Sequence, residues 1–429
     1  MSTKKLAFAA IAAGLALSLA ACAPQSGSTA TSDTAKSSKI VYAIPSSWVK
    51  AGALQDNIKA YEKESGNTVE VLGIPDEQYD STVQARLTSG SGIDVFAGLD
   101  SIEKPGSVMI EITNPSFKSR MNESVYNSML AVDGKLYSYP TADGLATFGV
   151  LYNKSVFEAA GVTKAPTTLD ELTEDFKKVK ASGVDPLYLA GKDGWTLLQH
   201  RNAADADFVG GNKDVATELA TNKTTWAKVP GFDKQYQALS DWAKGGLLNA
   251  DALTGSYEQS TAAVASGKAG AIINGTWAIG AIRAANADVK LGFFALPNVG
   301  ADNVVALSKP NTMHIAASSK VQKQAAELLD FLIQPARATA FLDAAPGVPG
   351  FKDAKATKAD SAITDVLGYV DAGKVVGHFD NLSRFPTPQD DTIAAYQELI
   401  AGRIDVAEFT KRYDSAWTNA GKTAGIAGF

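Results

Sequence analysis

Apolar residues after position 38 recur with two different periods, which predict alternating strands and helices. Residues 39–44 and 68–74 are short apolar runs rich in β-branched side chains, as expected for strands. Between them, residues 54–61 repeat apolar side chains at helical spacing, and a second helical segment at 79–87 leads to a third strand at 93–96. This order predicts an α/β layer with a mainly parallel sheet.

The segment 133–162 differs, because a short polar insert separates its two apolar runs. The first run ends at residues 139–140, and the second covers residues 148–152. The insert, residues 141–144, contains the single carboxylate of Asp143 and ends in glycine. Proline and glycine at such a break favour backbone that leaves one compact body for another. We therefore expect an interdomain crossing here.

Helix and strand signals continue through the second half of the chain. Thr168 and Glu171 have the spacing of a capping box at a helix start, and residues 186–189 read as a short strand. Ser319 with Gln322 gives a second capping signal before another apolar stripe. These signals extend the α/β pattern beyond the crossing.

The N-terminus indicates export. Two lysines precede an apolar run at 6–21, about the length of a signal-peptide core and short for a membrane span. The run ends in LAAC, which resembles the lipobox of bacterial lipoprotein precursors, where cleavage precedes the cysteine and its thiol takes a diacylglyceryl group. We expect residues 1–21 to be a signal peptide, and residues 22–38 to be the lipidated Cys22 and a disordered tether. The alternative is an ordinary secretory signal with a chance cysteine.

Dual acylation, including palmitate, would hold the protein stably at the outer face of the cell membrane. The predicted localisation is therefore extracytoplasmic, with the lipid anchor as the only contact with the membrane.

Composition and motif content exclude several classes of function. The chain has 40 basic and 46 acidic residues, a net charge of −6, and no basic stripe, which argues against nucleic-acid binding. Cys22 is the only cysteine, so no disulfide is expected. His200, His314 and His378 lack paired metal-ligand spacing, and no P-loop, dinucleotide fingerprint or nucleophile elbow is present. We expect no metal, no cofactor and no enzymatic activity.

Several ordered motifs resemble those of the family 1 extracellular solute-binding proteins of ABC importers, the maltose-binding-protein-like group. The first block carries Gly134, Lys135, Tyr137, Pro140, Tyr152, Asn153, Lys154, Phe157, Gly161, Pro166, Thr167, Gly183, Pro186 and Leu187. Later blocks are residues 267–277, which end in Gly-Thr-Trp, residues 319–332, and residues 347–349. The resemblance covers nearly all of the chain after residue 39.

The resemblance implies a two-lobed periplasmic-binding-protein-like α/β fold. Each lobe would be a mainly parallel sheet flanked by helices, with the ligand cleft at the hinge. Lobe 1 would comprise residues 39–142 plus 297–343, and lobe 2 residues 143–296 plus 344–429. The return crossing would lie at Leu296-Pro297-Asn298.

Three residues are the main candidates for ligand contact. The resemblance implies that Trp277 stacks on a sugar and that Trp195 supplies a second stacking aromatic. Asp143 lies in the crossing loop, where a carboxylate can accept hydrogen bonds from ligand hydroxyl groups. The insert around Asp143 is longer than its counterpart in maltose-binding protein, so counting residues does not equate Asp143 with the ligand-binding glutamate of that protein. Trp226, Trp242 and Trp417 have a helical context and are expected to pack in the core.

Four further residues have two interpretations each. Trp48 follows the first strand and is either a ligand platform or a packing residue. Asp100 follows the third strand and is either a ligand contact or a helix cap. Asn311 and Arg384 lie in loops and are weaker candidates for ligand contact.

The sequence thus predicts a monomeric, lipid-anchored solute-binding protein that captures a carbohydrate by hinge closure, with an oligosaccharide as the expected ligand. The partner implied by the resemblance is the permease of an ABC transporter. Three alternatives are a secreted sugar-active hydrolase, a binding protein for a non-sugar solute, and a purely structural or adhesive lipoprotein.

Overall fold

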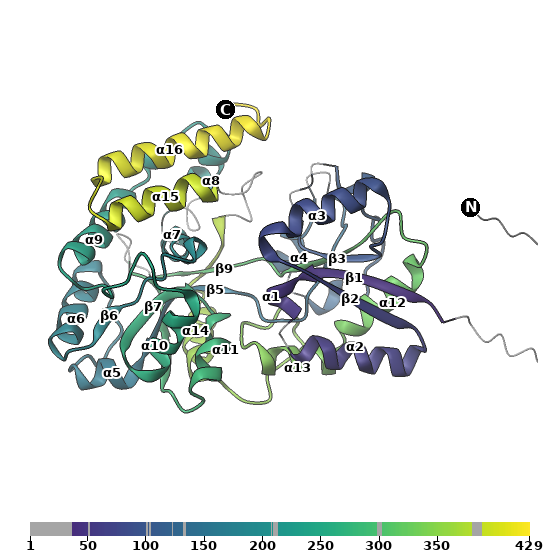
Figure 1. Cartoon of the computed structure of the whole chain (residues 1–429), viewed down its shortest axis with the longest axis horizontal. Helices are drawn as coiled ribbons and strands as arrows, with labels where there is room; N and C mark the ends of the chain where they lie inside the picture. The colour runs from purple at the N-terminus through teal and green to yellow at the C-terminus, as the bar shows by residue number, and fades with distance from the viewer. Residues whose placement is uncertain are drawn as a thin grey trace, which may run out of the picture. The chain divides into compact units, whose positions relative to one another are not determined.

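Two mixed β-sheets organise the chain, and helices cover both faces of each sheet (Figure 1). The structure is a computed structural model that describes residues 37–49, 52–99, 102, 104–121, 123–131, 134–206, 208, 213–297, 303–379 and 388–429. Residues Ser38–Phe429 form one compact unit that contains both sheets. We call the part of the chain built on each sheet the first and the second lobe.

The first sheet has the strand order β2-β1-β3-β10-β4. Its strands are β1 (Lys39–Pro45), β2 (Thr68–Ile74), β3 (Val95–Ala97), β4 (Tyr139–Pro140) and β10 (Thr312–Ile315). β2 and β3 pair parallel with β1, whereas β10 pairs antiparallel with both β3 and β4. The order of strands and helices expected for residues 39–96 is confirmed.

Side chains alternate across the first sheet, so each face buries a different core. Tyr42 and Ile44 point into the core that contains α2, α12 and α13, while Ala43 points toward α3. The helices of this lobe are α1 (Ser46–Val49), α2 (Gly52–Ser65), α3 (Asp76–Ser89), η1 (Pro105–Ser107), η2 (Lys118–Arg120), α4 (Glu123–Asn127), α12 (Gln322–Leu332) and α13 (Pro335–Ala344).

The second sheet has the order β11-β9-β5-β7-β6, and β8 also pairs with β5. Its strands are β5 (Thr147–Asn153), β6 (Asp185–Leu187), β7 (Ala269–Gly275), β8 (Leu291–Phe294), β9 (Val305–Leu307) and β11 (Val375–Gly377). β5 pairs antiparallel with β7, β8 and β9. The expectation of a mainly parallel sheet is therefore wrong for this lobe, because its central strand has only antiparallel neighbours.

Helices divide between the two faces of the second sheet. Leu151 on β5 faces α10, α11 and α14, whereas Val150 faces the larger layer that includes α6, α7, α9, α15 and α16 (Figure 1). The helices are α5 (Lys154–Ala159), α6 (Leu169–Ala181), η3 (Gly194–Thr196), α7 (Leu198–Asp205), α8 (Lys213–Ala220), η5 (Trp226–Lys228), α9 (Phe232–Lys244), α10 (Tyr257–Ser266), α11 (Ala278–Ala285), α14 (Ser361–Asp371), α15 (Gln389–Ile400) and α16 (Val406–Thr423). Trp226, Trp242 and Trp417 are fully buried in this layer, which confirms that they are packing residues.

Within the described residues, the chain passes between the sheets at three places. The first passage is residues 141–146 between β4 and β5, and the second is residues 308–311 between β9 and β10. The third is residues 345–360 between α13, which contacts α2, and α14, which contacts β8. The crossing expected within residues 133–162 is the first of these passages.

The expected return crossing at Leu296-Pro297-Asn298 is wrong. β9 follows it in sequence and still pairs with β5, so the second lobe continues to Leu307. The proline follows strand β8 without ending the lobe, because β9 completes the same sheet.

The expected boundary after residue 343 is also too early. Arg120 of the first lobe donates to the Asp353 carboxylate at 2.7 Å, and Met121 pairs with Phe351.

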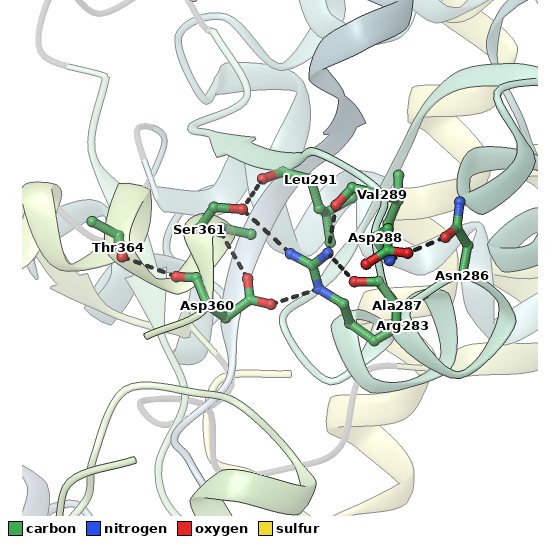
Figure 2. A network of polar contacts seen from close by, with 10 residues as sticks. Arg283, Asn286, Ala287, Asp288, Val289, Leu291, Asp360, Ser361 and Thr364 are labelled. Atoms are coloured by element: carbon green, nitrogen blue, oxygen red, sulfur yellow. Dashed lines mark hydrogen bonds and ion pairs between the residues drawn. The ribbon is translucent and has the colours of Figure 1, made fainter. Parts of the chain in front are cut away.

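The third passage joins the second lobe at a dense polar network (Figure 2). The Arg283 guanidinium at the end of α11 donates to Asp360 at 2.7 Å and also to the carbonyl of Val289. Asp360 caps α14 through the backbone amide of Ala362, at 2.8 Å, and the Ser361 hydroxyl donates to Leu291 of β8. The start of α14 is thereby fixed to the second sheet.

The two capping signals have different outcomes. The Thr168 side chain accepts the backbone N–H of Glu171 and caps α6 as expected. The Glu171 carboxylate accepts the backbone N–H of Thr167, whereas a capping box would use that of Thr168. Ser319 does not cap α12, because that helix begins at Gln322 after Val321. The Ser319 hydroxyl instead donates to Asp94 at 2.6 Å and accepts the N–H of Val321.

A buried polar cluster lies inside the helical layer of the second lobe. His200 on α7 is almost fully buried, 5.5 Å from the Tyr236 ring and 6.4 Å from the Tyr396 ring. The buried ion pair of Arg201 and Asp205 lies on the same helix. Burial lowers the pKa of His200 to about 3, so the imidazole is neutral in the folded protein at ordinary pH.

We predict that His200 makes folding sensitive to moderate acid. Below about pH 6.5 this histidine is protonated in the unfolded chain, whereas it stays neutral in the folded protein. The free energy of unfolding therefore falls by up to ~1.4 kcal/mol per pH unit between about pH 6 and 4. His200→Phe should remove this contribution. Urea unfolding across that range measures it as the difference between the two pH profiles, and parallel profiles would show that His200 contributes nothing.

In the part of the chain that the structure describes, no helix has both the length and the apolar character needed to cross a membrane.

Candidate functional site

Two tryptophans lie together at the surface of the second lobe. Among the described residues, Trp195 and Trp277 are the large apolar side chains that remain exposed, each at 37%. Their ring centroids are 6.5 Å apart, and their planes are inclined by 46°. Paired exposed indoles are unusual on a globular surface, where large aromatic side chains are normally covered.

Trp277 is positioned by the end of β7. The strand ends at Gly275, and a Cβ atom at that position would lie 2.0 Å from the Trp277 ring. The indole therefore lies flat against backbone that only glycine leaves open. Phe148 of β5 packs edge-on against the same indole with a centroid distance of 5.6 Å.

Trp195 is held by the turn that follows β6. The Asp193 carboxylate in this turn accepts the backbone N–H of Tyr257, at 2.6 Å, and so ties the turn to the start of α10. The Tyr257 ring lies 5.1 Å from Trp195. Burial raises the pKa of the Tyr257 phenol to about 12, so its hydroxyl stays protonated and can donate at neutral pH.

Asp143 lies in the first passage and contacts the second. The Asn311 side-chain amide donates to the Asp143 carboxylate at 3.2 Å, and the backbone N–H of Thr141 donates to the carbonyl of Asn311 at 2.7 Å. Burial raises the pKa of Asp143, and hydrogen bonds from Thr141 and Asn311 only partly oppose this. Burial is the main cause of a raised pKa of Tyr42 on β1, and the charges of Tyr79 and Asp143 add to it.

The segment from Asp143 to Phe148 connects these two groups. Asp143 and Asn311 supply polar atoms where the chain passes between the lobes. Phe148 lies a short distance along the same chain and adjoins the aromatic group formed with Trp277, Trp195 and Tyr257. Flat apolar surfaces and hydrogen-bonding groups are the two features that a solute with both C–H faces and hydroxyl groups requires.

The remaining predicted residues lie outside this group. Trp48 lies in α1, half-buried against the core of the first lobe, which favours its packing interpretation. Asp100, Arg384 and the lipidation candidate Cys22 are outside the described residues. Leu99, just before Asp100, has a φ of 64°, which is rare for leucine and indicates a constrained turn after β3.

The described residues hold no group of three or more histidine, cysteine or acidic side chains placed to bind a metal ion. A groove along α16, of about 630 Å³, is lined by Asp233, Asp414 and neighbouring polar residues, and contains no member of the aromatic group.

Sequence reasoning missed Tyr257 and Phe148. Tyr257 directly follows Ser256, which forms a full capping box with Gln259, so the sequence could have predicted that Tyr257 begins a helix. Its contact with Trp195 could not be predicted from a local pattern, because the two residues are 62 positions apart in sequence. Phe148 resembled an ordinary strand residue.

Comparison with known proteins identifies the family. A sequence profile described as "Bacterial extracellular solute-binding protein" matches residues 46–339. The chain belongs to this family.

Similar members of the family include proteins named for sugars. The melibiose/raffinose/stachyose-binding protein MelE of Bacillus subtilis is 22% identical over 383 residues, 87% of each chain. The multiple sugar-binding protein of Streptococcus mutans is 25% identical over 290 residues, 65% of this chain and 67% of that protein. The structure of the solute-binding protein RafE in complex with raffinose has a TM-score of 0.76 at 22% identity, covering 89% of this chain and 99% of that one.

Family membership confirms the resemblance, the two-lobed α/β fold and the assignment as a solute-binding protein rather than an enzyme. It does not test individual ligand contacts, which stay predictions.

We predict that Gly275→Ala moves the Trp277 indole without unfolding the protein. Gly275 does not have the left-handed backbone that would itself demand glycine, so the effect is steric. The near-ultraviolet circular dichroism and tryptophan fluorescence should change. Gly280→Ala on the adjacent α11 is the matched control, because its Cβ would meet only an ordinary contact at 3.7 Å. Identical spectra for both variants would contradict the observed placement of the indole.

Proposed function

We propose that this solute-binding protein captures a carbohydrate, preferably an oligosaccharide, between its two lobes and delivers it to the permease of an ABC transporter. The observation that carries the proposal is the contact between the exposed indoles of Trp195 and Trp277. Sugar rings present flat C–H faces that stack on such surfaces. The names of the relatives, which refer to melibiose, raffinose and stachyose, support the same class of ligand.

The proposed mechanism is hinge closure. A ligand that rests on the aromatic group of the second lobe and bonds the Asp143 and Asn311 side chains would stabilise the closed arrangement through its extra contacts there. The permease would then recognise the closed form. The protein would act as a monomer.

We also propose that the mature chain is a lipoprotein. Cleavage after the signal peptide at residues 1–21 would free Cys22 for acylation, palmitate included, and residues 23–38 would serve as a tether. The LAAC sequence and membership of an extracellular family support this localisation outside the cytoplasm.

Trp277→Ala should weaken binding of the recognised sugar more than about tenfold, because it removes a whole stacking surface. A thermal-shift screen of residues 38–429 with melibiose, raffinose and stachyose would first find the ligand, with a non-sugar polyol as the contrast. Isothermal titration then compares the parent, Trp277→Ala and Trp277→Phe, which keeps an aromatic face and should lose less. Unchanged affinity in Trp277→Ala would remove this residue from the site. A melting temperature that no sugar raises would point to a non-sugar solute.

Binding should also weaken as pH falls through the raised pKa of Asp143. The ionised carboxylate accepts hydrogen bonds from sugar hydroxyl groups, and protonation removes part of that capacity, so affinity is full at high pH and declines toward acid. Asp143→Asn should bind more weakly at neutral pH and lose the pH dependence. Asp56→Asn, on the exposed face of α2, is the control and should keep the parent profile. If Asp143→Asn retains the parent's pH dependence in titrations, Asp143 does not contact the ligand.

A further inference from the structure

The first and third passages are paired along their backbones. The N–H of Leu145 donates to the carbonyl of Val348 at 2.7 Å, and the N–H of Val348 donates back at 3.3 Å. Next to this pair, the N–H of Ser308 in the second passage donates to Ala146 at 2.9 Å. The connections between the lobes therefore form one bonded bundle rather than independent linkers.

Two glycines make the closest contact within this bundle. A Cβ atom on Gly144 would lie 2.3 Å from the Cα atom of Gly347, and a Cβ atom on Gly347 would lie 2.7 Å from the Cα atom of Gly144. Neither glycine has a positive φ, so space and not backbone conformation demands glycine here. The obstructing atoms are backbone on both sides, so no change of side-chain rotamer could make room.

The two passages that carry these glycines are each attached closely to both lobes. Gly144 lies between β4 of the first sheet and β5 of the second, only a few residues from either strand. The third passage is held to the first lobe by Arg120 and Asp353, and to the second lobe by Arg283 and Asp360 (Figure 2). We therefore expect a shift of one glycine away from the other to change the angle between the lobes.

We propose that the Gly144–Gly347 contact is the pivot that sets the balance between open and closed lobes, and so sets ligand affinity from outside the ligand contacts. The proposal rests on the proposed function for the closure itself. An added methyl group at either glycine would push the first and third passages apart at the same place. Both variants should therefore shift the balance between open and closed lobes in the same direction. Affinity follows that direction: it falls if the lobes open and rises if they close.

Spin-label distances in the unliganded protein test the pivot without requiring a known sugar. Spin labels at Lys63→Cys of α2 and Lys177→Cys of α6 lie on different lobes, so the distance between them measures the lobe arrangement. Residues 38–429 contain no other cysteine that could be labelled. Gly144→Ala and Gly347→Ala should each move the distance distribution the same way. Once a ligand is known, each variant should also change affinity by about threefold or more.

Gly368→Ala on α14 is the matched control, because its Cβ would meet nothing within 4 Å. If both test variants give the control's distances and affinity, or shift in opposite directions, the pivot is wrong. If neither variant folds by circular dichroism, the contact is a packing requirement and the proposal also fails. A distance shift in a protein that binds no sugar would overturn the proposed ligand class and leave the pivot standing.

Discussion

The pairing of β5 on both edges is the constraint on which the rest of the structure depends. β7 bonds one edge of this strand, and β8 and β9 bond the other, so its position in the second sheet is fixed along its length. The strand begins directly after the first passage, so its fixed position also restricts where Asp143 and Gly144 can lie. Its pairing with β7 also brings Phe148 opposite Gly275, next to Trp277.

The candidate site and the pivot follow from this arrangement but use different physics. The site depends on exposed surface, since two indoles in contact with each other remain uncovered. The pivot depends on the absence of side chains, since Gly144 and Gly347 touch through backbone.

Much of the fold could be predicted because it is encoded locally. Strands β1, β2 and β3, helices α2, α3 and α6, and the crossing after Pro140 all follow from periodicity, capping residues and breaker residues within a few turns of chain. The failures have non-local causes. The expected return crossing is too early because pairing between β9 and β5, about 160 residues apart in sequence, decides where the second lobe ends.

The sequence by itself determined the family and the order of elements, because motifs and turn chemistry are properties of neighbouring residues. It also indicated four separate candidates for ligand contact, which are Trp195, Trp277, Asp143 and Asn311. Only the tertiary structure decided that these residues form two contacting pairs, one of indoles and one of polar side chains, and that Tyr257 joins the aromatic group. It also decided that Trp48 packs against the core. The physical reason is that side-chain contacts across lobes and sheets depend on strand pairing and close packing, which no local pattern specifies.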